Sequence, residues 1–207
     1  MILAHRTLRV EVDLMVGMRW GVLWFELLLA ILPMGATRAS AAADLLTACS
    51  APPAALGKYQ PAKPGSLLPA VPFVDADGTD RPLDGLRGEP LLVNVWATWC
   101  APCVEEMPAL DRLAAQTKQT GIRVVALSAD REGAAVVRRF YEVNGVRNLP
   151  VAVDKTARVA RATGIGGLPT TLLYAADGTE VGRVTGVAKW DAPEVVTFLS
   201  TCLAGRS

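Results

Sequence analysis

The sequence predicts an α/β protein in which a mixed β-sheet is flanked by helices. Short apolar runs of strand character alternate with segments of helical apolar spacing in the middle of the chain, which is typical of parallel strands joined by helices. The strand 91–96 is apolar on both faces except for Asn94, as expected of a strand covered on both sides. Strands at 170–174 and 180–185, joined by a turn at Asp177-Gly178, predict a terminal antiparallel pair.

The other elements are expected on either side of the strand 91–96. Asp77-Gly78 lies between two short apolar stretches within 71–83, which indicates an N-terminal hairpin. Apolar spacing, glycine and proline positions then predict, in chain order, a helix at 101–119, a parallel strand at 122–128, a helix ending near Asn144-Gly145, a short strand at 149–153, a short helix at 156–163 and a final helix at 192–202.

Length and composition limit the classes of function. The chain has 207 residues, a net charge of +1 and four cysteines, which suits one domain with an extension. Lysine and arginine are scattered along the sequence, so nothing favours nucleic acid as a partner. The only histidine is His5, which argues against Cys-His protease chemistry and against a histidine-assisted copper centre.

The segment 1–41 has the features of a secretory signal. An apolar run at 20–32 follows Arg19, and the small residues Ala39-Ser40-Ala41 then match a cleavage site after Ala41. The alternative is an uncleaved N-terminal membrane anchor, for which the run is short against the roughly 20 residues that span a bilayer. Either outcome predicts a periplasmic or other extracytoplasmic domain, secreted or anchored to the inner membrane, which meets the membrane only through this segment.

Residues 42–68 are rich in alanine and proline and show no sustained period, which predicts a linker or arm before a domain at 69–207. Leu46-Thr47-Ala48-Cys49 matches a short lipidation pattern, but charged residues separate it from the apolar run. The even cysteine count favours instead a structural disulfide between Cys49 and Cys202. Such a bridge would tie the arm to the last helix.

The sequence Trp99-Cys100-Ala101-Pro102-Cys103 places two cysteines where a strand meets a helix. The first turn of a helix presents unpaired N–H groups and the positive end of its dipole, which stabilise a thiolate at Cys100. Pro102 fits this turn, where no N–H is needed. Cys103 lies one turn on, where it can attack a mixed disulfide formed at Cys100. The motif predicts thiol–disulfide exchange, in which Cys100 attacks and Cys103 resolves.

A zinc site and a static bridge are the alternatives for this pair. Zinc takes about four ligands, and an all-cysteine site would need Cys49 and Cys202, neither of which lies in a second CxxC. We therefore expect no metal site, and no cofactor beyond the redox-active pair Cys100/Cys103. A non-catalytic copper(I)-binding module that uses the same two thiols stays open as a rival from a different class.

The run Val93–Cys103, together with Glu106-Met107-Pro108 and Gly167-Leu168-Pro169-Thr170-Thr171, resembles the thioredoxin superfamily and, within it, the exported TlpA/ResA-like branch. The resemblance covers roughly residues 69–203. It implies a thioredoxin-like fold with one extra strand-helix unit within 128–163.

The resemblance also implies roles for individual residues. Leu168-Pro169 would be a cis peptide that docks an extended substrate segment, with Trp99 at the rim of the same substrate-binding site. Glu106 matches the acid that this branch carries near its thiols, where partial burial would raise its pKa and let it relay a proton to or from Cys103. The alternative is that Glu106 is only a favourable charge near a helix N-terminus. Asn94 departs from thioredoxin, which has a buried aspartate there.

These observations predict an exported thiol–disulfide oxidoreductase. The resemblance implies a reductant of cysteines in other exported proteins, such as apocytochrome c or copper-centre and oxidase assembly proteins, recharged by a membrane thiol reductase. A general oxidant or isomerase stays open, because potentials in this superfamily run from about −270 to about −120 mV, a difference of about 7 kcal/mol. A few contacts around one thiolate could supply that difference.

Overall fold

The computed structural model describes residues 49–203. The predicted signal or anchor at 1–41 and the first part of the predicted arm lie outside the described residues. Within residues 49–203, no helix has the length and apolar character needed to cross a membrane.

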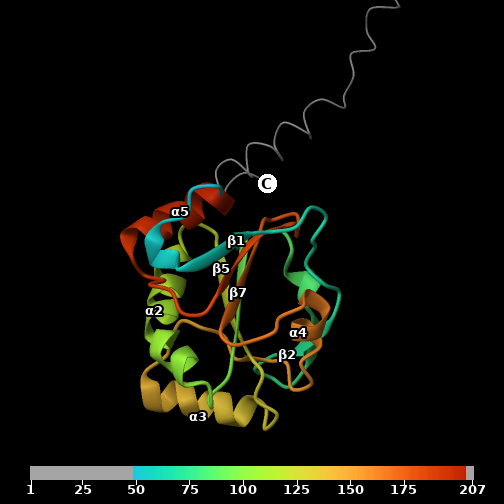
Figure 1. Ribbon diagram of the computed structural model, residues 1–207. Coiled ribbons are helices and arrows are strands. Elements are labelled where there is room, and N and C mark those ends of the chain that lie inside the picture. The colour runs from blue at the N-terminus through green and yellow to red at the C-terminus, as the bar shows by residue number, and fades with distance from the viewer. Residues whose placement is uncertain (1–48, 204–207) are drawn as a thin grey trace, which may run out of the picture. The chain divides into compact units, whose positions relative to one another are not determined.

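One mixed sheet forms the centre of this part of the chain (Figure 1), with its eight strands in the order β1-β8-β7-β4-β5-β6-β2-β3. Strand β4 pairs in parallel with β5 and antiparallel with β7, so it lies in the middle of the sheet. The strands are β1 (Lys58–Pro61), β2 (Pro72–Val74), β3 (Asp80–Pro82), β4 (Leu91–Trp96), β5 (Arg123–Ser128), β6 (Ala152–Val153), β7 (Thr170–Tyr174) and β8 (Glu180–Thr185). The predicted mixed α/β sheet is confirmed.

Helices cover both faces of the sheet. They are α2 (Ala101–Thr117), α3 (Ala134–Asn144), α4 (Arg158–Thr163) and α5 (Pro193–Leu203), with short 3-10 helices η1 (Ala54–Leu56) and η2 (Leu83–Leu86). Figure 1 shows α2 and α5 on one side of the sheet and α4 on the other. Because side chains alternate along a strand, β4 serves both cores. Leu92 and Trp96 pack with α2, α3 and α5, whereas Leu91, Val93 and Val95 pack with η2 and α4.

The predicted hairpin and the extra strand-helix unit are both present, and they extend the sheet together. Strands β2 and β3 pair antiparallel, and Val74 of β2 bridges Val153 of β6. Strand β6 is shorter than the predicted 149–153 and is followed by α4. Pro150 has no backbone N–H to donate to a sheet, which is consistent with a strand that begins only at Ala152.

The described part of the predicted arm packs against the domain. Strand β1, which the sequence patterns did not predict, pairs antiparallel with β8. The ring of Tyr59 lies over Gly182, where an added Cβ would come within 2.5 Å of ring carbons. A disulfide joins Cys49 to Cys202 in α5. Three of the four β1 residues are exposed, so no alternation of apolar and polar residues marked this strand.

Candidate active site

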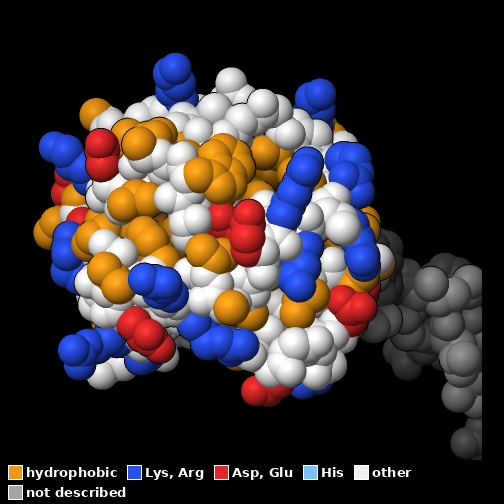
Figure 2. Space-filling view, turned by 90° about the horizontal axis from the view of Figure 1, so that it is seen from below, with side chains coloured by type: hydrophobic (Ala, Val, Ile, Leu, Met, Phe, Trp, Pro, Cys, Tyr) orange, Lys and Arg blue, Asp and Glu red, His pale blue; other side chains and the backbone are white. Residues whose placement is uncertain are grey.

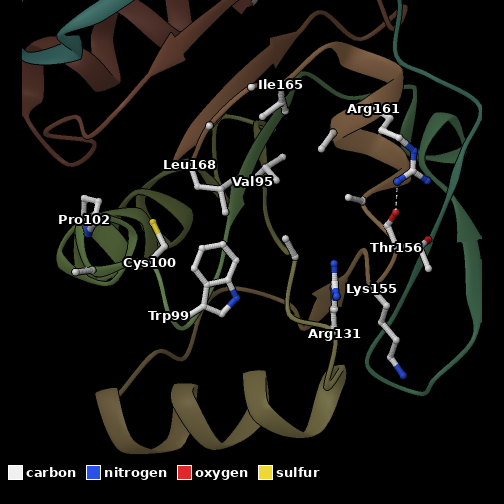
Figure 3. A pocket seen from close by; sticks show the side chains of 16 residues that line it. Val95, Trp99, Cys100, Pro102, Arg131, Lys155, Thr156, Arg161, Ile165 and Leu168 are labelled. Atoms are coloured by element: carbon white, nitrogen blue, oxygen red, sulfur yellow. Dashed lines mark hydrogen bonds between the residues drawn. The ribbon is translucent and has the colours of Figure 1, made fainter.

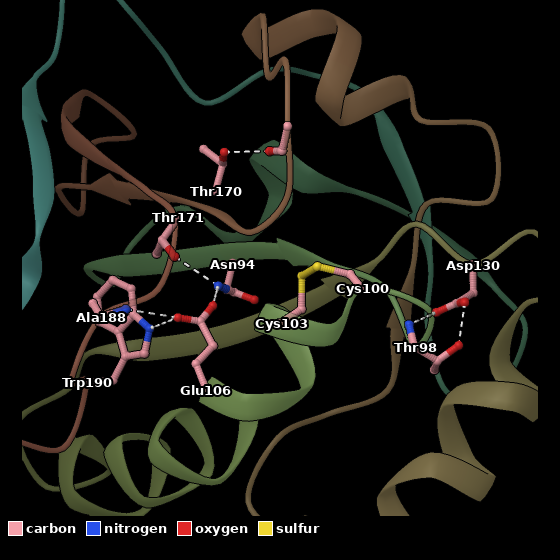
Figure 4. The surroundings of a disulfide bond; sticks show 11 residues. Asn94, Thr98, Cys100, Cys103, Glu106, Asp130, Thr170, Thr171, Ala188 and Trp190 are labelled. Atoms are coloured by element: carbon pink, nitrogen blue, oxygen red, sulfur yellow. Dashed lines mark hydrogen bonds between the residues drawn. A yellow bond between two sulfur atoms is a disulfide. The ribbon is translucent and has the colours of Figure 1, made fainter.

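Cys100 and Cys103 form a disulfide at the N-terminus of α2 (Figure 4). Strand β4 leads into a turn in which the Cys100 N–H donates to the Ala97 carbonyl over 3.1 Å. Cys100 is the N-cap residue of α2 and Pro102 lies in the first turn, so Cys100 is at the end of the helix where backbone N–H groups have no partner within the helix. Cys100 is 7% exposed and Cys103 is fully buried. An incoming sulfur can therefore reach Cys100 first.

A buried carboxylate holds the loop that precedes Cys100. Asp130 follows β5 and is 1% exposed. It accepts hydrogen bonds from the Thr98 N–H at 2.9 Å, the Thr98 hydroxyl at 2.7 Å and the Ser128 hydroxyl at 2.7 Å. Sequence analysis missed this residue. The available signal was its position just after the strand parallel to β4, since the carboxyl ends of neighbouring parallel strands meet at one edge of a sheet.

The Leu168–Pro169 peptide bond is cis, the isomer that the resemblance implied. It precedes β7, in which Thr170 pairs with Val95 of β4, close to the loop that carries the cysteines. The Thr170 hydroxyl donates to the Gly167 carbonyl over 2.7 Å and fixes the turn. Figure 3 shows Leu168, Trp99 and Cys100 lining one pocket.

This pocket is a groove of about 1130 Å³. The Trp99 ring lies at its rim and is 69% exposed. Figure 2 looks onto the end of the molecule that carries the N-terminus of α2, and it shows exposed hydrophobic side chains beside Lys and Arg side chains, with a few acids. The groove opens to the surface beside Cys100 and is not a closed cavity.

On the other side of the disulfide, Glu106 is nearly completely buried. It lies three residues after Cys103 on α2, and residues at this spacing are neighbours on a helix surface. Its carboxylate accepts hydrogen bonds from Asn94 Nδ2 at 2.9 Å, the Trp190 indole N–H at 2.8 Å and the Ala188 N–H at 3.2 Å (Figure 4). Burial raises the pKa of Glu106, and these hydrogen bonds oppose the rise without cancelling it.

Asn94 joins Glu106 to β7. Its Nδ2 group donates to Glu106 and, at 2.9 Å, to the Thr171 hydroxyl. Its Oδ1 atom is buried and has no hydrogen-bond partner within residues 49–203. Trp190 was missed as a partner of Glu106, and Thr171 as a partner of Asn94; they lie 84 and 77 residues beyond those partners in sequence. No periodicity in the sequence indicates where an indole N–H points.

A search of residues 49–203 finds no group of three or more His, Cys, Asp or Glu side chains that could hold a metal ion.

Comparison with known proteins decides the family. The redoxin family model matches residues 63–199, which include both cysteines, Glu106 and the cis proline. The chain belongs to the redoxin family. This redoxin is 35% identical over 122 residues to the thiol-disulfide oxidoreductase ResA of Bacillus anthracis, covering 59% of the chain and 69% of the relative. It is 37% identical over 119 residues to ResA of Halalkalibacterium halodurans, and this match covers 56% of the chain and 66% of the relative.

Solved structures agree on the fold. A Chlorobium tepidum protein described as a thiol:disulfide interchange protein DsbE superposes with a TM-score of 0.59 and 24% identity, covering 67% of the redoxin and 96% of that chain. StoA from Bacillus subtilis superposes with a TM-score of 0.51 and 21% identity, and the match covers 62% of the redoxin and 99% of StoA. The thioredoxin-like fold is confirmed. With the ResA relatives, the redoxin is a thiol–disulfide oxidoreductase of the ResA type.

Proposed function

We propose that this redoxin works outside the cytoplasm as a reductant of protein disulfides, with Cys100 as the attacking thiol and Cys103 as the resolving thiol. The observation that carries the proposal is the asymmetry of the pair. Cys100 caps α2 beside an open groove, whereas Cys103 is fully buried one turn further on. Only Cys100 is positioned to meet another protein, and only Cys103 is positioned to release it.

The reaction begins with the reduced redoxin. The Cys100 thiolate attacks one sulfur of the client disulfide, and the other client sulfur leaves as a thiolate and takes up a proton. A mixed disulfide now joins Cys100 to the client. Cys103 then loses its proton and attacks the Cys100 sulfur, which releases the second client sulfur and forms the Cys100–Cys103 disulfide. The second client sulfur also leaves as a thiolate and is protonated. The client has then gained two electrons and two protons, whereas the redoxin has lost two electrons and the proton of Cys103; the other proton comes from solvent, which received it when Cys100 became a thiolate.

Glu106 is proposed as the group that takes the proton of Cys103. A carboxylate at its usual pKa is a weak base toward a thiol, and burial reduces this mismatch by raising the pKa of Glu106. Its three hydrogen bonds hold the carboxylate in one position on the same helix as the thiol. Glu106 is 5% exposed, and this burial favours the proton-relay role over the alternative from the sequence, a favourable charge near a helix N-terminus.

The client is proposed to dock as an extended segment at the backbone before Pro169. Leu168 borders the groove next to Cys100, and a strand-like client segment around its cysteine could hydrogen-bond to this backbone. Trp99 offers a large exposed ring for the apolar part of the same segment.

The partners follow from the proposed direction. A reductant that works outside the cytoplasm must be reduced again after each turnover, so we propose a membrane thiol reductase as its electron donor. The clients proposed from the ResA-like resemblance are exported proteins with reactive cysteines, such as apocytochrome c or copper-centre assembly proteins. The apolar run at 20–32 and the small residues Ala39-Ser40-Ala41 support export of the domain.

Turnover of a disulfide-linked peptide pair by the reduced redoxin tests the proposal. Cys100→Ala should abolish reduction, and Cys103→Ala should accumulate the mixed disulfide with one peptide per protein. Cys49→Ala with Cys202→Ala is the matched control, because it removes the other disulfide and should retain turnover. Reduction by the Cys100→Ala protein, or equal trapping of peptide at either cysteine, would contradict the assigned roles.

A further inference from the structure

The groove beside Cys100 is lined by three basic side chains, Arg131, Lys155 and Arg161. Figure 3 shows them along the wall that faces Cys100 and Trp99 across the groove. Among the described residues, no aspartate or glutamate lines this groove. The wall that an incoming client would meet next to the reactive sulfur is therefore positively charged.

These charges are open to a ligand. All three side chains are exposed, and the ion pairs found within residues 49–203 involve none of them. Arg161 donates one Nη1 hydrogen bond to the Thr156 carbonyl, which fixes its guanidinium at the groove and leaves its other N–H groups for a partner.

The nearby acids are directed elsewhere. Asp130, next to Arg131, uses both carboxylate oxygens on Thr98 and Ser128. Asp154, next to Lys155, accepts hydrogen bonds from the N–H groups at the start of α4. Glu132 is exposed and does not line the groove. The positive charge of the wall is therefore not neutralised from within the groove.

The fold holds two of the basic residues in place. Arg131 follows β5 and Lys155 follows β6, two parallel strands whose carboxyl ends meet at this edge of the sheet. The Lys155 stem lies against Gly133, where an added Cβ would come within 2.2 Å of the lysine Cε. This close approach packs the loop after β5 against the turn before α4, so the two cations share one wall.

We propose that this groove selects clients that carry an acidic segment next to their reactive cysteine. The inference rests on the proposed function, because the groove is used only if Cys100 attacks a protein disulfide. An extended client segment docked before Pro169 would lay its flanking residues along the basic wall. Carboxylates there would pair with the three cations. Because these ion pairs are partly exposed, each pair would raise the affinity for the client only a few-fold, and the three together by about tenfold.

Three synthetic peptides of equal length provide the test. Each carries one cysteine, disulfide-linked to the same small chromogenic thiol, and flanking residues that are glutamate, glutamine or lysine. The rate of reduction by the full-length reduced redoxin is measured at low and at high salt. We expect the glutamate peptide to react about tenfold faster than the glutamine peptide at low salt, the lysine peptide to react slowest, and the differences to shrink at high salt.

Reversing the charge of two groove residues tests whether the preference for acidic peptides arises in the groove. Arg131→Glu with Lys155→Glu should invert the order of the two charged peptides, with each rate expressed relative to that of the glutamine peptide on the same variant. Lys63→Glu with Arg139→Glu makes the same change in net charge at exposed positions outside the groove and should keep the wild-type order.

The outcomes separate the two proposals. Equal rates for all three peptides with the wild-type protein would overturn acidic selection and leave disulfide reduction intact. Failure to reduce any peptide would overturn the proposed function itself. An equal effect of the two charge reversals would attribute the preference to net charge and overturn the role of the groove.

Discussion

Glu106 is an ionisable side chain placed where water is nearly absent, and it couples the stability of this redoxin to pH. Burial raises its pKa above the usual 4.5. Folding therefore takes up a proton between pH 4.5 and the raised pKa. The stability that the neutral carboxyl contributes is complete below the usual pKa and is lost as the pH rises through the raised one.

Glu106→Gln should remove this pH dependence, because glutamine does not ionise. Urea unfolding of the oxidised proteins at about pH 4 and about pH 8 should show the free energy of unfolding of E106Q rising relative to wild type, by about 1.4 kcal/mol for each unit of the pKa shift. Glu105→Gln, on the same helix and exposed, is the matched control and should show no such trend. A constant difference between E106Q and wild type would contradict the raised pKa.

Asn94→Asp should make Glu106 harder to ionise. The substitution puts a second carboxylate about 2.9 Å from Glu106 Oε1, and two carboxylates this close share a proton. We expect the variant to lose stability relative to wild type as the pH rises above the usual pKa of a carboxyl group. Asn94→Leu removes the same hydrogen bonds without adding a charge, so it should cost about 1–3 kcal/mol at low pH. Because the Asn94 hydrogen bond lowers the pKa of Glu106, its loss should add a smaller further cost as the pH rises. Parallel pH profiles for the two variants would count against the shared proton.

Among single residues, short sequence motifs predicted those whose role depends only on their neighbours in the sequence. Cys100 and Pro102 could be placed because a strand-to-helix junction is visible in the sequence. Trp190 and Asp130 could not, because their hydrogen bonds depend on where distant segments meet. Three donors from two distant segments, β4 and the loop between β8 and α5, surround Glu106, and only the folded chain brings them together.

At the scale of elements, the Cys49–Cys202 disulfide connects the described arm to α5 across a sequence separation of 153. Replacing both cysteines by alanine should lower the free energy of unfolding by up to about 5 kcal/mol, because the open chain regains the entropy of a long loop. Urea unfolding of this variant tests it. The Cys100→Ala, Cys103→Ala variant opens a separation of only three and should lose less. An equal loss in the two variants would exclude the loop explanation.

Helices and strands whose apolar residues form a clear pattern in the sequence could be predicted, whereas elements without such a pattern could not. Strand β4 is apolar apart from Asn94, and α2 repeats apolar residues at helical spacing, so both were predicted close to their observed bounds. Strand β1 was not predicted, because it is mostly exposed and is held by backbone pairing with β8 and by the contact of Tyr59 with Gly182. Neither interaction leaves a local signal.

At the scale of the molecule, the sheet brings distant residues to one edge. Lysine and arginine are scattered in the sequence, yet β5, β6 and α4 gather Arg131, Lys155 and Arg161 on one wall beside Cys100. The chemistry of the cysteine pair was predictable from a short motif. The charge of the surface that would meet a client depends on strand order, which the sequence patterns did not supply.

The potential of the Cys100/Cys103 couple tests the central claim most directly. The protein is equilibrated in dithiothreitol buffers of graded ratio, quenched in acid and alkylated, and the oxidised fraction of the peptide with both cysteines is measured by mass, separately from Cys49 and Cys202. The account predicts a potential near that of thioredoxin, about −270 mV. A value near about −120 mV would mean that the couple oxidises its clients, and would contradict the proposed reductant.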